Sequence, residues 1–318
     1  MKKTIVLSLS FVLLLAWAAV PAFSWGSATH AYILDHIGKK LPLMNVNELY
    51  GVMGADIFNY VFTLTPEQMA YVNVYTHGSP GNEAFMEVWK KARWWGFEKS
   101  LAFGYVAHNE VWGCDFTAHI HALTTGLSEG YVITKAKLLM PYLAAVLYQA
   151  QQQAGIPDDQ KIAFPDDINL MLCHNLIENA GDIFLLRAAP QIGQKIVTAS
   201  VLRSNDFPAL VTRAMGPDWK DAVFAAEKEF RKTMILYGAA LMQGEESAIQ
   251  TLSAQIAQIG VAYVKAQTGL EIPLDLATYL ATAGTTQGMT LIADDYMKEV
   301  NATVNFVRMQ LVHHGVRY

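Results

Sequence analysis

The sequence predicts an all-α fold, a multi-helix bundle. Apolar residues recur at three- and four-residue intervals over long windows, which is the period of a helix with one buried face. Runs with the alternating pattern of strands are scarce. Glycine and proline clusters at 78–81, 155–157 and 216–217 separate the helical windows and favour helix ends there.

Eight windows carry the helical pattern most clearly. In chain order they are residues 66–75, 82–95, 98–124, 132–153, 166–187, 219–242, 245–268 and 287–311. At the start of the fifth window, Asp166 and Asp167 place negative charge in a first turn, where the helix dipole favours it.

The first 24 residues have the pattern of a secretory signal peptide. Lys2 and Lys3 precede an apolar run over residues 4–20, and the small residues Ala22 and Ser24 suit cleavage before Trp25. The run is short for a membrane span, so cleavage is favoured over an uncleaved anchor. We therefore expect a mature chain that begins at Trp25 and is secreted or periplasmic.

Composition limits the domains and the partners. With 318 residues the chain can bury a large core in one or two domains. Residues 25–185 hold the candidate metal ligands, whereas 186–318 carry no motif and are expected to add helices to the same domain rather than form a second one.

The charge of the mature chain limits its partners. Cleavage removes Lys2 and Lys3 and leaves 21 basic and 28 acidic residues, so the net charge of the mature chain is −7. This negative charge disfavours long nucleic acid as a partner. The sequence does not indicate an oligomeric state.

Metal-ligand residue types are concentrated in the first half of the mature chain. Seven of the nine histidines lie between His30 and His174. In a continuous helix over 98–124, Asp115 and His119 would each fall within about 20° of His108 on the helical wheel. A buried carboxylate between two imidazoles requires compensation, which a divalent cation would supply. A hydrogen-bonded polar stripe is the alternative.

A second helix offers His174 and Glu178 at the i, i+4 spacing, at which two side chains can bind one ion. Asp182, one turn further, is a candidate acceptor for the His174 ring. Cys114 and Cys173 each precede a candidate ligand and could form a disulfide or remain as two core thiols.

The mature start WGSATH, residues 25–30, resembles the start of the tri-zinc phosphodiesterase superfamily, which contains the bacterial zinc-dependent phospholipases C and the fungal single-strand nucleases. Further similarity lies in the GAD stretch at 54–56, YTHGSPG at 75–81, FGYVAH at 103–108 and the His-x-x-x-Glu pair at 174–178. The resemblance spans residues 25 to about 182.

The resemblance implies a cluster of two or three zinc ions, with the first residue bound through its free amine and carbonyl oxygen. It assigns nine ligands: Trp25, His30, Asp56, His77, His108, Asp115, His119, His174 and Glu178. It also implies that Asp56 assists the attacking water. Glu110 is the alternative to Asp115 should the helix break near Gly113.

From this resemblance we expect a zinc-dependent phosphodiesterase of the phospholipase C type, which hydrolyses phospholipid head-group phosphoesters with metal-activated water. One alternative is a zinc-dependent nuclease or nucleotidase of the same superfamily. Another is a non-enzymatic, exported, helical metal-binding protein.

Residues 89–97, WKKARWWGF, are basic and aromatic. They suit transient contact with a membrane surface or stacking on bases, although an ordinary amphipathic helix end with core tryptophans is the simpler explanation. His36 and His121 are expected to point away from the ions, and His313 and His314 near the C-terminus are expected in solvent.

Overall fold

The computed structural model describes residues 25–60 and 64–318. Over these residues the regular structure is helical and no strand occurs, which confirms the predicted all-α, multi-helix fold. The proposed signal peptide, residues 1–24, lies outside the described residues. No described helix is both long enough and apolar enough to cross a membrane.

The helices fall into an N-terminal and a C-terminal series. The first series is α2 (Ser27–Ile37), α3 (Pro42–Gly54), η1 (Ala55–Tyr60), α4 (Pro66–Thr76), α5 (Met86–Lys91), α6 (Glu98–His108), η2 (Phe116–Ile120), α7 (Tyr131–Gln153), η3 (Asp158–Gln160), α8 (Asp166–Phe184) and η4 (Leu185–Arg187). The second is α9 (Ile192–Leu202), α10 (Phe207–Met215), η5 (Pro217–Trp219), α11 (Lys220–Leu241), α12 (Glu245–Thr268), α13 (Leu274–Ile292) and α14 (Tyr296–His313).

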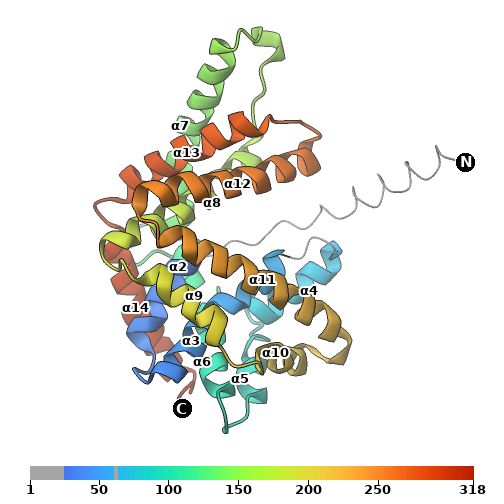
Figure 1. Ribbon diagram of the computed structural model, residues 1–318, viewed down its shortest axis with the longest axis vertical. Coiled ribbons are helices and arrows are strands. Elements are labelled where there is room, and N and C mark those ends of the chain that lie inside the picture. The colour runs from blue at the N-terminus through green and yellow to red at the C-terminus, as the bar shows by residue number, and fades with distance from the viewer. Residues whose placement is uncertain (1–24, 61–63) are drawn as a thin grey trace, which may run out of the picture.

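The two series interleave in space. In Figure 1, α7, α8, α12 and α13 form the upper part of the molecule, and most of the remaining helices lie below them. Helices α12 and α13 pack on each other and on α8, while α9 and α11 pack on α2, α3 and η1. Helix α14 lies along α2.

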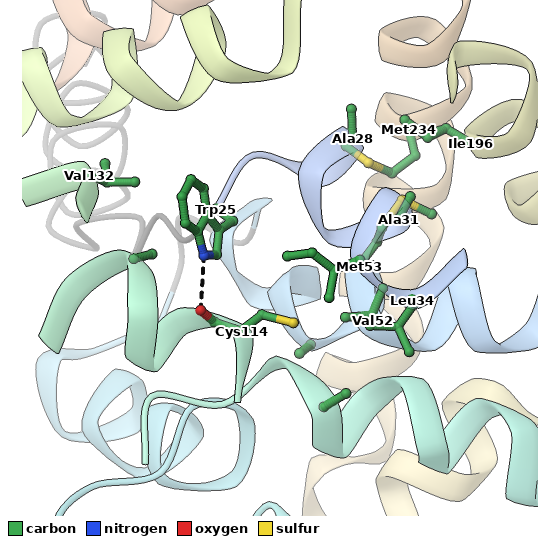
Figure 2. Packing of buried hydrophobic residues seen from close by; sticks show 14 of the residues in the cluster. Trp25, Ala28, Ala31, Leu34, Val52, Met53, Cys114, Val132, Ile196 and Met234 are labelled. Atoms are coloured by element: carbon green, nitrogen blue, oxygen red, sulfur yellow. Dashed lines mark hydrogen bonds between the residues drawn. The ribbon is translucent and has the colours of Figure 1, made fainter. Parts of the chain in front are cut away.

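Most of the buried apolar side chains form one cluster that runs from Trp25 to Val316. Figure 2 shows Ile196 of α9 and Met234 of α11 beside the start of α2. The C-terminal helices therefore contribute to the same core as the helices that carry the candidate ligands.

Three predicted helical windows differ from the structure. The helix expected over 82–95 is only Met86–Lys91, because residues 78–85 form turns around Gly78 and Gly81. The window 287–311 spans the end of α13 and most of α14, which are separated by residues 293–295. The single helix predicted over 98–124 is wrong, since α6 ends at His108.

Two glycines bring α3 and α6 into backbone contact. A Cβ added to Gly104 would lie 2.0 Å from the carbonyl oxygen of Glu48, and one added to Gly51 would lie 2.2 Å from that of Leu101. This close approach matters to the site, because α3 leads into Asp56 and α6 ends at His108.

We expect Gly104→Ala to lower the free energy of unfolding by about 2 kcal/mol, because the added methyl meets backbone that cannot turn away. Gly260→Ala is the matched control, since its Cβ would touch only Leu172 Cδ2, at 3.4 Å. The control should be neutral or more stable by up to about 1 kcal/mol, from helix propensity. Chemical denaturation measures both, and equal effects would contradict the close-contact argument.

Candidate metal centre

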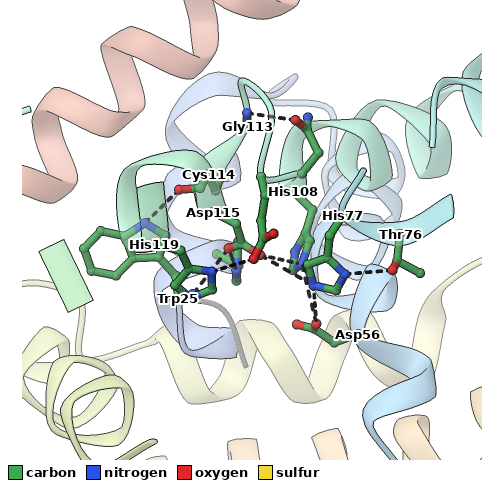
Figure 3. A network of polar contacts seen from close by, with 12 residues as sticks. Trp25, Asp56, Thr76, His77, His108, Gly113, Cys114, Asp115 and His119 are labelled. Carbon is green, nitrogen blue, oxygen red and sulfur yellow. Dashed lines mark hydrogen bonds and ion pairs between the residues drawn. The ribbon is translucent and has the colours of Figure 1, made fainter. Parts of the chain in front are cut away.

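Four side chains from four segments meet in a first buried group: Asp56 of η1, His77 at the end of α4, His108 at the end of α6, and Asp115. His108 Nε2 lies 2.9 Å from Asp115 Oδ2 and 3.5 Å from Asp56 Oδ1. His77 Nε2 lies 3.4 Å from Asp56 Oδ1 and 3.6 Å from Asp115 Oδ2 (Figure 3). The ligand atoms of His77, His108 and Asp115 lie within 4.8 Å of one another and could hold a metal ion, as could those of His30, Asp56 and His108.

Asp115 reaches this group because the chain leaves the helix after His108. Asn109 has an extended ψ of 159°, and its side-chain Oδ1 accepts hydrogen bonds from the backbone N–H groups of Val111 and Trp112, both at 2.8 Å. This turn replaces the expected continuous helix, so the helical-wheel prediction is wrong, although His108 and Asp115 still meet. A short π-helix, η2, then follows Asp115 and carries His119.

The other oxygen of Asp115 faces a second group at the start of the described chain. Asp115 Oδ1 lies 3.0 Å from His30 Nε2 and accepts a hydrogen bond from the Trp25 backbone N–H at 3.3 Å. The Trp25 indole N–H donates to Cys114 O at 2.9 Å, which fixes the tryptophan ring (Figures 2 and 3). Asp115 thus lies between two groups of candidate ligands.

A third group consists of His119, His174 and Glu178. The Nε2 atoms of the two histidines are 3.1 Å apart, and Glu178 Oε1 lies 3.0 Å from His174 Nε2. Glu110, the alternative to Asp115, instead accepts a hydrogen bond from His119 Nδ1 at 2.8 Å. The structure therefore brings all nine residues implied by the resemblance into three adjacent groups, and it places Glu110 behind His119.

The hydrogen bonds on the far sides of the rings define the tautomers of the first group. His108 Nδ1 lies 2.9 Å from the carbonyl oxygen of Val52, which can only accept, so this nitrogen carries the hydrogen. The Thr76 hydroxyl donates to Val72 O and therefore accepts from His77 Nδ1, at 2.7 Å. Thr76 and Val52 were not predicted, because nothing in the sequence marks a carbonyl or hydroxyl that a distant ring will meet.

These tautomers direct two Nε2 lone pairs at each other, since His77 Nε2 and His108 Nε2 are 3.1 Å apart. The same distance separates His119 Nε2 from His174 Nε2, and His119 Nδ1 is committed to Glu110. Facing lone pairs repel unless a proton or a cation lies between them. Asp115 Oδ2 and Glu178 Oε1 face the same nitrogens, at 2.9 Å from His108 Nε2 and 3.0 Å from His174 Nε2. The residues present therefore fit divalent cations.

The charges of the cluster shift its pKa values. Burial would raise the pKa of Asp115, but the imidazoles of His108 and His30 outweigh it and lower that pKa well below its usual range. Burial is likewise overcome at Asp56, whose pKa is lowered by His108 and His77. The opposite holds for His119, where burial lowers the pKa but the carboxylates of Glu110 and Glu178 raise it to about 10.

Asp182 does not orient His174, so that prediction is wrong. Its carboxylate accepts hydrogen bonds from the backbone N–H groups of Ala28 and Thr29, at 2.7 and 2.8 Å, and from the Tyr237 hydroxyl. Asp182 thereby binds the first turn of α2, where the helix dipole favours negative charge. A Cβ on Gly26 would lie 2.3 Å from Asp182 Oδ2, so only glycine leaves room for this contact.

The remaining candidates lie outside the cluster. Cys114 and Cys173 are both buried and both free, so they form no disulfide. The His36 Nδ1 atom lies 2.8 Å from the carbonyl oxygen of Tyr32, at the surface. His121 is exposed, and so is His313, as expected. His314, also expected in solvent, instead stacks on Trp112 with ring centroids 4.4 Å apart.

No protein-family model, curated protein or solved structure matches this chain.

The raised histidine pKa values predict that cation binding displaces protons. Burial lowers the pKa of His108, but Asp115 and Asp56 outweigh it and raise that pKa well above the usual value. We expect release of about two protons per chain near pH 7, one from His108 and one from His119. Calorimetry in buffers of different ionisation enthalpy counts them, and Glu110→Gln should release fewer. Binding without proton release would contradict the prediction.

The raised pKa of His119 also determines how the stability of the metal-free protein changes with pH. The folded-state pKa of His119, about 10, lies above the unfolded value of about 6.5. Its contribution to the stability of the metal-free protein is therefore fully present below pH 6.5 and lost as the pH rises through about 10. Thermal unfolding of metal-free protein across this window measures the loss.

Proposed function

We propose that this chain is an exported zinc-dependent phosphodiesterase of the phospholipase C type, which hydrolyses phospholipid head-group phosphoesters. The observation that carries the proposal is the convergence of five imidazoles and three carboxylates, with two pairs of Nε2 atoms 3.1 Å apart. Imidazole-rich ligand sets suit zinc, whereas magnesium and calcium prefer oxygen.

Charge supports an anionic substrate. Asp56, Asp115 and Glu178 together carry three negative charges, whereas two or three divalent cations carry four to six. The loaded ligand set would be positive by one to three charges, or neutral to positive by two when Glu110 beside His119 is counted, inside a chain that is negative overall. A phosphodiester monoanion complements such a site, and zinc would supply the Lewis acid for its oxygens and lower the pKa of the attacking water.

The ligands divide among three positions. Asp56, His77, His108 and Asp115 would hold one ion, His119, His174 and Glu178 a second, and Trp25, His30 and Asp115 a third. The Asp56 side chain is 10% exposed, and its carboxyl has a lowered pKa. A carboxylate with a low pKa is a weak base, so we assign Asp56 the role of orienting the attacking water through a hydrogen bond.

A surface near α5 supports transient contact with lipid. Trp94 and Trp95 are 70% and 72% exposed, and tryptophan favours the headgroup zone of membranes. The neighbouring cations are partly neutralised, since Lys90 pairs with Glu87. Lipid contact here would therefore depend on the indoles more than on charge.

Correctly processed protein should contain two to three zinc ions and hydrolyse a chromogenic phosphocholine ester. Chelation should lower this activity by at least about 1,000-fold, because the attacking water loses its activation, and zinc should restore it. Elemental analysis and the two assays measure these outcomes. Single-stranded DNA is the competing substrate, and faster cleavage of DNA would favour the nuclease alternative. Bound zinc without hydrolysis of either substrate would favour a metal-binding protein.

One added residue before Trp25 should remove one ion, because the first amine would then lie beyond the ligand group of His30 and Asp115. We expect zinc content to fall by about one ion per chain and hydrolysis by about 100-fold, since ligand loss costs several kcal/mol of charge stabilisation. The same residue added after Tyr318 is the control. Unchanged zinc occupancy in the N-terminal extension would refute the role of the Trp25 amine.

A further inference from the structure

An apolar cavity adjoins the candidate metal centre on the side formed by the C-terminal helices. A mouth cavity of about 140 Å³ is lined by Glu178 and Asn179 of α8, by Gly26, and by side chains of α11 and α12. An inner cavity of about 50 Å³ lies between α7, α8, α12 and α13. The two share Leu172, Ile256 and Gly260 as lining residues, so they adjoin each other.

The lining changes from polar to apolar with distance from the metal ligands. At the mouth, the side-chain oxygens of Asn175 and Asn179 are buried and accept no hydrogen bond within the described residues. The inner cavity is lined only by apolar side chains and Gly260, including Leu143, Phe164 and Val264. Protein cores are normally close-packed, so an apolar cavity that adjoins a candidate active site has room for the apolar part of a ligand.

Helix α8 connects the two environments. His174 and Glu178 contribute to the metal centre, while Leu172, Asn175 and Asn179 line the mouth cavity. Leu172 precedes Glu178 by six residues, which places it about 9 Å further along the helix. A ligand with a phosphoester at Glu178 and a hydrocarbon chain towards Leu172 would match both ends.

We infer that the mouth and inner cavities bind one hydrocarbon chain of the substrate, drawn out of the lipid surface. This inference rests on the proposed phosphodiesterase function, and it names the substrate class as single-chain or long-chain amphiphilic phosphoesters. The C-terminal helices α12 and α13 thereby form the binding site for the apolar part of the substrate. Gly260 lies at the junction of the cavities, where a larger side chain would obstruct the chain.

Binding of straight-chain alkyl phosphonates to zinc-loaded protein tests the inference without requiring hydrolysis. Affinity measured by calorimetry, below the micelle concentration, should rise about fourfold per methylene until the cavity is filled. Gly260→Leu should weaken binding of long-chain phosphonates at least tenfold and leave methyl phosphonate unchanged. Gln258→Leu, on the exposed side of α12, is the matched control and should bind like the wild type.

Ala277→Leu narrows the inner cavity from α13 and repeats the test if Gly260→Leu unfolds. Equal affinity for all chain lengths, or variants that bind long chains as tightly as the wild type, would overturn the inference. Failure of the proposed function gives a different result, because phosphodiesters would not be hydrolysed although long-chain phosphonates still bind. If the variants hydrolyse phosphodiesters and still show the chain-length dependence of the wild type, only the role of the cavities in binding the hydrocarbon chain is refuted.

Discussion

The burial of the Asp115 carboxylate among imidazoles is the constraint on which the site depends. A fully buried carboxylate is costly unless each oxygen is compensated. One oxygen of Asp115 faces His30 and the Trp25 N–H, and the other faces His108 and His77. The irregular turn at Asn109 and the π-helix after Asp115 are departures from regular structure that this placement requires.

Helix α8 links the candidate metal centre to helix α2 and to the mouth cavity. Glu178 contributes to the third ligand group, and Asp182, one turn later, holds the first turn of α2 and so positions His30. Leu172 and Asn179 on the same helix line the mouth cavity. Any displacement of α8 would therefore change the ligand geometry and the cavity together.

The sequence predicted the helices well wherever local periodicity decides them, as at Glu245–Thr268, where the bounds agree. The single helix predicted over 98–124 was wrong, because a contact between distant residues ends the helix at His108. The Asn109 side chain stabilises a turn there, and this turn brings Asp115 to His108. The nine candidate ligands were predicted from the resemblance, because the family's ligands follow one another in a fixed order of residue types. Thr76 and the true partners of Asp182 could not, since such contacts depend on how distant segments pack.

The C-terminal helices hold the cluster of candidate ligands in place. Helix α14 contacts both sides of the site: Thr303 Oγ1 lies 2.9 Å from Thr117 Oγ1, beside Asp115, and Tyr296 bonds the Thr29 hydroxyl beside His30. Glu299 accepts hydrogen bonds from the backbone N–H groups of Leu123 and Thr124, which fixes the segment after His119. A cation site requires ligands in fixed positions, and neighbours that are not ligands supply this. Residues 186–318, which carry no ligand motif, supply those neighbours.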